Sequence, residues 1–301
     1  MTWRGVSARP YSKEWPDLIS LVLARLDPTD CALLSRVGKP WLAAVVSRGL
    51  PRAGKEDAVP LKMISFVRSA ELLGWAKDNG CRWNERTCAL AAEGGHLAAL
   101  RWARDEGCEW DARTCAFAAR GGHLEVLVWA REHNCEWDVR TCKAAAAGGH
   151  LAVLQWAREH HCPCDELEMC GVAARGGHLS VLQWARAHGA TLGTWTCAEA
   201  ARGGHLRVLQ WAREHSCEWN EFTCAYAAAG GHLRVLQWVR EHDCEWDELT
   251  CAYAARGGHM EVMQWAREQG APWDEEYVRA RAAEGAHVEK LAMWLADHGA
   301  P

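Results

Sequence analysis

The sequence has no long hydrophobic run and no excess of basic residues. The longest apolar run near the start, Leu18 to Leu23, is too short and lies too far along the chain for a signal peptide or a membrane span. The 34 basic and 39 acidic residues are mixed along the chain and give a net charge of −5, which provides no basic patch for a nucleic acid or a membrane surface. We therefore expect a chain that neither crosses a membrane nor binds DNA or RNA.

The sequence also lacks the signatures of common enzymes. It contains no glycine-rich phosphate loop, no nucleophile elbow and no His-Glu-x-x-His metal motif. Carboxylates are abundant, but they fall at positions that begin helices, where they need no catalytic role. The sequence therefore predicts no catalytic residue, no cofactor and no metal, in a protein that is not an enzyme.

Two residue types are unusually abundant. Nineteen Trp stand against three Phe and four Tyr, and such an imbalance indicates a duplicated unit. Fifteen Cys without a secretory signal favour free thiols in a reducing compartment over a disulfide framework. We expect the chain to work in the cytoplasm, the nucleus or both.

A Gly-Gly-His motif recurs at a nearly fixed distance. Its histidines, counting one that follows Gly-Ala, are His96, His123, His150, His178, His205, His232, His259 and His287. The steps between them are 27 or 28 residues, and a Trp follows each His by six or seven residues. A worn copy upstream, with Trp75 at the matching distance, gives about nine units. A fixed period in this range is typical of a solenoid.

The first half of each unit predicts a short helix of small residues. Asp111 has the side chain of an N-cap, and Asn or Asp stands at the same place in most other units. The helix that follows carries Cys115 and ends at Gly121-Gly122, where a left-handed residue costs least. Such small side chains should let the first helices of neighbouring units stack closely.

The second half of each unit predicts an amphipathic helix. In one unit its buried face is expected to consist of Leu124, Leu127 and Ala130, which recur at helical spacing. Trp129 beside them should fill the wedge between second helices, whereas Arg131 is expected in solvent. Neither helix buries its apolar surface alone, so the copies must stack.

The repeated Cys and His have two interpretations, metal ligands or parts of the scaffold. Cys pairs seven residues apart recur: Cys81/Cys88, Cys108/Cys115, Cys135/Cys142, Cys217/Cys224 and Cys244/Cys251. Zinc ligands usually stand two to four residues apart and converge on one point, whereas these pairs are spread one to a unit. The second Cys of each pair falls on the buried side of the short helix, which favours a core thiol over a metal ligand. The His after Gly-Gly is expected to bond backbone groups of the turn at the helix start.

The stretch "AARGGHLEVLVWAREH" resembles the ankyrin repeat, in which a small-residue helix ends at Gly and a His begins the second helix. The resemblance covers roughly residues 61–301. It departs from the family in its period, 27 residues against about 33, and in Arg-Thr-Cys-Ala where the family has Thr-Pro-Leu-His. The missing residues fall between Asp138 and Arg140, where the ankyrin hairpin would be. The resemblance implies an all-α, ankyrin-type helix-turn-helix solenoid of about nine repeats that binds protein without hairpin fingertips.

Residues 11–50 contain no Gly-Gly-His and predict a small three-helix unit, joined to the repeats by a linker over 51–60. This segment resembles an F-box in the frame "WP…L..LDPTD...LS.V.K.W", although Trp15 stands for the usual Leu and Gly38 for the usual Cys. The F-box family docks a Skp-type adaptor, and the resemblance assigns that contact to Pro16, Leu23, Leu26, Leu34, Val37 and Trp41. The alternative is a helical cap that shields the end of the solenoid.

Two functions fit this order of parts. The first is a substrate receptor of a cullin–RING (SCF-type) ubiquitin ligase, whose F-box-like segment docks the adaptor while the repeats hold a target protein. The second is an ankyrin-type interaction scaffold with a helical cap and no role in ubiquitin transfer. The repeats themselves do not separate the two, because only the N-terminal segment differs in what it would bind.

Positions that vary between copies are candidates for target recognition, because scaffold positions repeat. The resemblance to ankyrin repeats places two such positions on the concave face. The residues that they supply for target binding are Phe117, Arg120, Arg175, Arg202, Tyr226, Tyr253 and Arg256. Aromatic and Arg side chains dominate protein interfaces, so this face is expected to suit an acidic, partly apolar segment of a target protein.

Overall fold

The structure is a computed structural model that describes residues 67–70, 73–74, 77 and 84–298. The F-box-like segment, the linker and most of the worn first copy lie outside the described residues, and so do all six predicted adaptor contacts. The described chain forms eight helix pairs, and its only regular elements are helices. The predicted fold class, an all-α helix-turn-helix solenoid, is confirmed over this part of the chain.

Each pair consists of a first helix and a second helix of similar length. The first helices are α5 (Glu85–Glu93), α7 (Ala112–Gly121), α9 (Val139–Ala147), α11 (Glu166–Arg175), α13 (Thr194–Arg202), α15 (Glu221–Ala229), α17 (Glu248–Gly257) and α19 (Glu275–Glu284). The second helices are α6 (Leu97–Asp105), α8 (Leu124–Glu132), α10 (Leu151–Glu159), α12 (Leu179–Ala187), α14 (Leu206–Glu214), α16 (Leu233–Glu241), α18 (Met260–Glu268) and α20 (Val288–His298). None of the described helices is long and apolar enough to span a membrane.

The first helices begin at the predicted caps. The Asp111 side chain accepts a hydrogen bond from the backbone N–H of Arg113, and Asp138 accepts one from Arg140 in the same way. Such a cap satisfies a backbone donor that the first turn of a helix leaves unpaired. The exceptions are α13, whose N-cap is Gly193, and α15, whose N-cap Asn220 makes no side-chain hydrogen bond to the helix. The start of most first helices is therefore fixed by the Asn or Asp that the sequence repeats.

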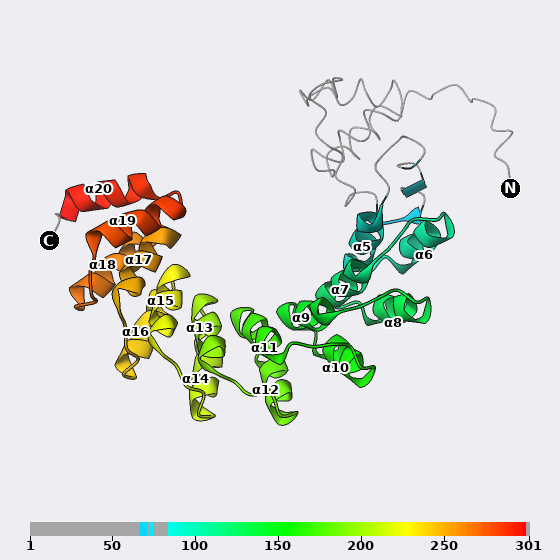
Figure 1. The fold of residues 1–301 in the computed structure, drawn as a ribbon, viewed down its shortest axis with the longest axis horizontal. Helices are drawn as coiled ribbons and strands as arrows, with labels where there is room; N and C mark the ends of the chain where they lie inside the picture. The colour runs from blue at the N-terminus through cyan, green and yellow to red at the C-terminus, as the bar shows by residue number, and fades with distance from the viewer. Residues whose placement is uncertain (1–66, 71–72, 75–76, 78–83, 299–301) are drawn as a thin grey trace, which may run out of the picture.

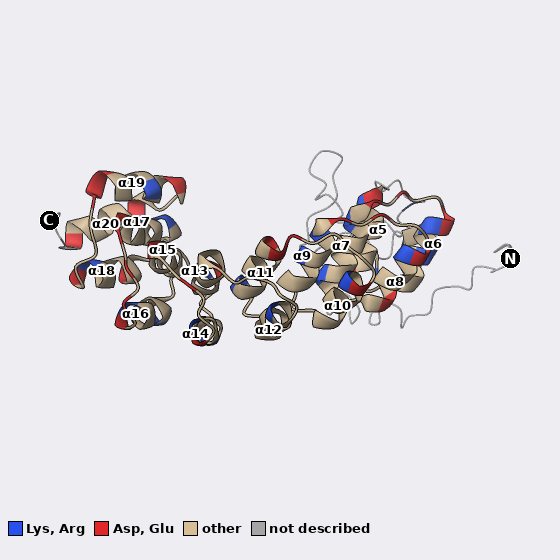
Figure 2. Ribbon diagram, turned by 60° about the horizontal axis from the view of Figure 1, so that its bottom comes forward, with Lys and Arg blue, Asp and Glu red and all other residues tan. Residues whose placement is uncertain are grey.

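The array curves because its two rows of helices pack differently. Successive first helices lie directly against one another from α5 to α19. Their contact faces consist of fully buried Cys and Ala, which allow close approach. Second helices mainly contact their own first helix, so they stand farther apart. The result is an arch with the first helices on its concave side (Figure 1). Acidic and basic residues are both spread along the arch (Figure 2).

The Gly-Gly-His motif connects neighbouring units. A Cβ on Gly203 would lie only 2.6 Å from the ring of His205 in the same unit, so this position has no room for a side chain. Gly204 has φ +76°, and a Cβ there would lie 2.6 Å from Nδ1 of His232 in the next unit. The six His rings from His123 to His259 thus each lie against one glycine of their own unit and one of the preceding unit. The two glycines serve different needs, since only the second requires a left-handed backbone.

The rings of His178, His205 and His232 bond to the preceding unit and not to their own turn, which corrects the sequence prediction. His205 Nε2 lies 2.9 Å from the carbonyl oxygen of Arg175, and His232 Nε2 lies 3.0 Å from that of Arg202. These carbonyls belong to the last turn of the preceding first helix. Carbonyls in the last turn of a helix have no hydrogen-bond partner within that helix. The ring makes no capping bond to its own helix. The motif therefore holds consecutive units in register.

The second helices bury a slightly different face from the predicted one. Leu127 and Ala130 are completely buried as expected, but Val126 is buried in place of Leu124, which is only half-buried. Arg131 does not extend into solvent. Its guanidinium donates a hydrogen bond to the carbonyl of Cys135 and lies over the Trp137 ring. Its aliphatic stem and charge thus help to close the end of the helix.

Candidate functional site

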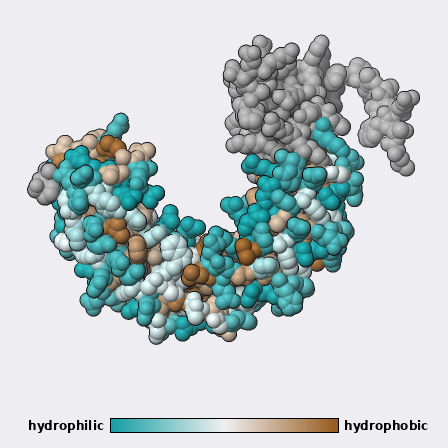
Figure 3. All heavy atoms as spheres, in the orientation of Figure 1, coloured by the Kyte–Doolittle hydropathy of each residue, from teal (hydrophilic) through white to brown (hydrophobic). Residues whose placement is uncertain are grey.

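The seven residues predicted for target binding all lie on first helices, which line the concave side of the arch (Figure 1). They come from α7 (Phe117, Arg120), α11 (Arg175), α13 (Arg202), α15 (Tyr226) and α17 (Tyr253, Arg256). The hollow of the arch is bordered by a mixture of hydrophilic and hydrophobic residues (Figure 3). Four of the seven, Arg175, Arg202, Tyr226 and Tyr253, come together on the consecutive first helices α11 to α17.

An aromatic cluster, consisting of Trp195, Phe222, Tyr226 and Tyr253, spans three consecutive first helices. Tyr226 is at its centre, with ring centroids 5.8 Å from Trp195, 6.4 Å from Phe222 and 6.0 Å from Tyr253. All three contacts are edge-to-face, the arrangement that aromatic quadrupoles favour. Trp195 and Phe222 remain 42 % and 39 % exposed. The cluster therefore presents pre-packed rings to solvent.

Trp195 lies where it does because of a glycine on the neighbouring helix. A Cβ on Gly171 of α11 would lie 2.6 Å from Nε1 of the Trp195 indole. Ala116 and Ala198 occupy the corresponding place in other units, so this glycine is specific to one copy. Its missing side chain lets the indole lie against the backbone of α11.

A buried carboxylate joins two of the predicted arginines to this cluster. The Glu199 side chain is only 4 % exposed and lies 3.3 Å from Nε of Arg175 and 3.8 Å from Nη1 of Arg202. The Arg202 guanidinium also lies 5.6 Å from the centre of the Tyr226 ring, within cation–π range. Two guanidinium groups share one carboxylate, so this side of the cluster keeps a net positive charge.

The environment of Tyr226 also affects its hydroxyl. Burial raises the pKa of Tyr226, and the nearby Tyr253 and Glu199 raise it further. The hydroxyl therefore stays protonated over the physiological range. A protonated phenol both donates and accepts hydrogen bonds, which suits a polar group of a bound peptide.

The remaining predicted residues do not join the cluster. Arg120 pairs with Glu93 at 3.7 Å and Arg256 with Glu284 at 3.6 Å, each across to a neighbouring unit. Phe117 is half-buried on α7, several units from Tyr226. Glu93 and Glu284 thus partly neutralise the predicted arginines, and the comparison of the repeated units did not reveal these pairs.

Sequence reasoning missed Trp195, Phe222 and Glu199. A signal for the first two exists, because their position in the unit holds Arg86, Arg113 and Arg140 in earlier copies and changes to aromatic residues in the middle of the array. Glu199 stood in a position already recognised as variable. Its role as a shared partner of two arginines depends on contacts between units, which the period does not provide.

The described cysteines are free, and all except Cys164 are buried, as predicted for core thiols. Their partners differ from the seven-residue pairs in the sequence. Cys197 Sγ of α13 lies 3.2 Å from Sγ of Cys217, which is 20 residues along, in the segment that follows α14. The Cys197 thiol donates to Cys217, so the pKa of Cys197 is raised and that of Cys217 is lowered. Among the residues that the structure describes, no group of three or more His, Cys, Asp or Glu is arranged to hold a metal ion.

No protein-family model matches the chain, and no curated protein matches it in sequence. A solved structure similar to this chain is the human ASB11 ankyrin repeat domain. The two share 16 % sequence identity with a TM-score of 0.42, over 62 % of this chain and 98 % of that one.

Proposed function

We propose that this chain is a protein-interaction module whose concave face binds a segment of a target protein. The observation that carries the proposal is the aromatic cluster, in which Trp195 and Phe222 are exposed while Tyr226 holds them edge-on. Large aromatic side chains supply most of the binding energy at protein interfaces. Rings that are already packed lose little conformational freedom on binding, which favours affinity.

The charges around the cluster define the target further. Arg175 and Arg202 share the single carboxylate of Glu199, which leaves one positive charge beside the rings. Arg256 is balanced by Glu284. The face therefore suits an apolar or aromatic segment with one acidic residue, which is less acidic than the sequence alone suggested.

The experiment is quantitative capture of cellular proteins by the full chain and by a Trp195→Ala/Phe222→Ala variant. Loss of two interface aromatics of about 2 kcal/mol each should reduce capture of a true target by more than about a hundredfold. The control is Met293→Ala, which removes a side chain that is 69 % exposed on α20. Equal capture by the folded double variant would place target binding elsewhere.

The finer function proposed is substrate recruitment to a cullin–RING (SCF-type) ubiquitin ligase. Its support is the F-box-like frame in residues 11–50, followed by a long array suited to holding a target. The test uses the full chain and the variants Leu34→Ala and Trp41→Ala against a purified Skp-type adaptor. Binding by the full chain and not by the variants supports the ligase role. No binding by a folded full chain would leave the second function, an interaction scaffold with a helical cap.

A further inference from the structure

A Trp immediately before the N-cap recurs on the side of the array formed by the second helices. The described residues in this place, called the loop Trp, are Trp110, Trp137, Trp219, Trp246 and Trp273. Two successive units depart from this pattern. Cys164 precedes α11 and Leu192 precedes α13 in the positions of the loop Trp.

The loop Trp fills a defined place in a regular unit. Trp137 lies edge-on to Trp156 of the next second helix, with ring centroids 5.8 Å apart. The guanidinium carbon of Arg131 lies 4.2 Å from the centre of the Trp137 ring. The same sandwich of Arg, loop Trp and helix Trp recurs around Trp219 and Trp246. In these regular units the loop Trp thus lies between an Arg guanidinium and the indole of the following second helix.

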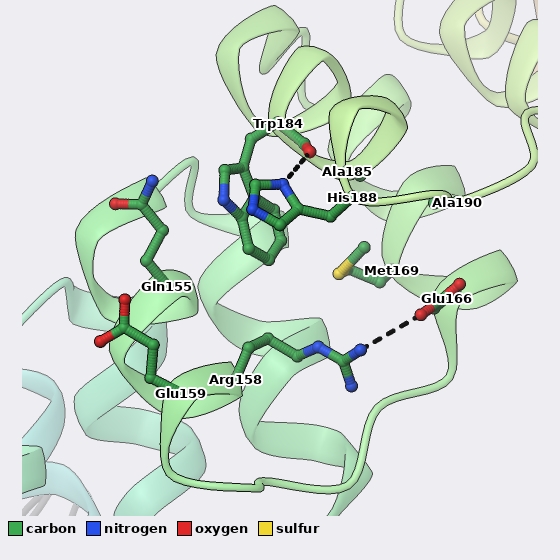
Figure 4. Close-up of a pocket in the computed structure, with 9 residues that line it drawn as sticks. All are labelled: Gln155, Arg158, Glu159, Glu166, Met169, Trp184, Ala185, His188 and Ala190. Carbon is green, nitrogen blue, oxygen red and sulfur yellow. Dashed lines mark hydrogen bonds and ion pairs between the residues drawn. The ribbon is translucent and has the colours of Figure 1, made fainter.

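The corresponding place in the unit of Cys164 holds a pocket of about 460 Å³ (Figure 4). Met169, which lines this pocket, has its sulfur 3.5 Å from the Cys164 sulfur. Arg158, the counterpart of Arg131, pairs with Glu166 at 3.2 Å. Trp184, the counterpart of Trp156, borders the pocket, and the His188 ring lies tilted against it with the ring centroids 4.6 Å apart. The walls that would surround a loop Trp are thus present, whereas the Trp itself is replaced by a small thiol.

The floor distinguishes this pocket from a similar groove elsewhere. A pocket of about 430 Å³ lies at the matching place between α6 and α8, and there Trp110 itself forms part of the lining. The pocket in the unit of Cys164 has no loop Trp in its lining. Two core residues line it instead, Met169 and Ala190, which are 2 % and 9 % exposed. A groove therefore occurs at this place in both units, and in the unit of Cys164 it reaches core side chains where the loop Trp is missing.

We propose that this pocket binds a tryptophan side chain carried by a partner polypeptide, in the place that the loop Trp fills in other units. The incoming indole would lie between the Arg158 guanidinium and the edge of Trp184, with its inner edge against the Met169 thioether. Each contact is attractive for an aromatic ring: cation–π, edge-to-face and sulfur–aromatic. The pocket volume lies in the usual range for ligand sites.

The rim of the pocket adds specificity for indole over a plain phenyl ring. Glu159 and Glu166 both line it and supply carboxylate oxygens. An indole N–H donates hydrogen bonds and accepts none, so a carboxylate at the rim is a suitable partner. This site lies on α10, α11 and α12, separate from the aromatic cluster on α13, α15 and α17, and does not depend on the proposed function.

The test measures binding of N-acetyl-5-fluorotryptophan amide to the full chain by ¹⁹F NMR. We expect saturable binding at one site and at least about tenfold weaker binding of the phenylalanine analogue, since the rim hydrogen bond is lost. Cys164→Trp places an indole of the chain against Met169 and Trp184, where the indole of the probe would lie, and should weaken probe binding by at least about tenfold. No saturable binding by about 10 mM probe, or unchanged binding to Cys164→Trp, would overturn the proposal.

Two further variants keep the test independent of effects on folding. Arg158→Gln removes the guanidinium that would contact the indole of the probe. It should weaken probe binding about three- to tenfold, within the range of a cation–π contact. Its matched control is Arg104→Gln, whose side chain lies 4.3 Å from a loop Trp that is already present, Trp110. Binding that falls equally in both variants would overturn the proposal. Trp137→Cys should open a second site and raise the stoichiometry from one to two.

Discussion

Replacing Gly204 with alanine should be much more damaging than replacing Gly107, although both glycines are left-handed. Their φ angles are +76° and +78°. A Cβ on Gly107 would meet nothing within 4 Å, whereas one on Gly204 would lie 2.6 Å from the His232 ring. Asn134 and Asp243 adopt φ of 63° and 61° at the place that Gly107 has in its unit. The backbone strain is therefore common to both substitutions, and the His ring is the difference.

The expected magnitudes follow from these contacts. A left-handed alanine costs about 1 kcal/mol at either site. At Gly204 the new methyl group must also displace the His232 ring, which adds about 1–3 kcal/mol for overpacking. Displacement breaks the 3.0 Å bond from His232 to the Arg202 carbonyl, worth about 1 kcal/mol. The Gly204 variant should thus lose roughly 2–4 kcal/mol more than the Gly107 variant.

Urea unfolding followed by far-UV circular dichroism would compare the two variants, and hydrogen exchange would show where stability is lost. Protection should fall at α13–α16 for Gly204→Ala and at α6 for Gly107→Ala. A His232→Ala background removes the ring, so Gly204→Ala should then cost only about 1 kcal/mol. Equal losses for Gly107→Ala and Gly204→Ala in the wild-type background would refute the role assigned to the His ring.

Three further predictions concern other contacts. Acidification from pH 7.5 to 5.5 should lower the free energy of unfolding measured in urea titrations. Burial lowers the pKa of His259 in the folded chain, so below about pH 6.5 the unfolded chain binds the proton more readily than the folded chain does. His259→Gln should reduce this pH dependence. Mild oxidation with diamide should link Cys197 to Cys217, and disulfide mapping that finds Cys217 linked to Cys224 would contradict the structure. Trp137→Ala should lower the free energy of unfolding by about 3 kcal/mol in calorimetry, whereas an unchanged value would show that the Arg–Trp–Trp sandwich is not stabilising.

The sequence predicted what happens within one unit. Caps such as Asp111, the small residues of the first helix and the left-handed second glycine all follow from local backbone chemistry, and the structure confirms them. The apolar face of the second helix was predicted to within one residue, since helical spacing leaves both Leu124 and Val126 close to that face. These features depend only on neighbours in the chain.

Contacts between elements were predicted poorly. Cys197 reaches Cys217 across the helix pair, and the His232 ring bonds to the carbonyl of Arg202 in the preceding unit. A period states which residues are equivalent but not how far each side chain reaches toward the next copy. For the same reason, the partners of Arg175 and Arg202 could not be read from the variable positions alone.

The departures from the repeat lie together, and this has a consequence for the dynamics of the array. Cys164, Gly171, Leu192 and Trp195 fall in two successive units, and α9 and α11 pack more sparsely than any other successive first helices that the structure describes. With no loop Trp to join the units there, this junction should open before the other interior junctions in native-state hydrogen exchange. Cys164→Trp should slow that opening, because it restores the aromatic contact to Trp184. Uniform exchange along α7–α17, unaffected by Cys164→Trp, would show that the missing Trp does not weaken the junction.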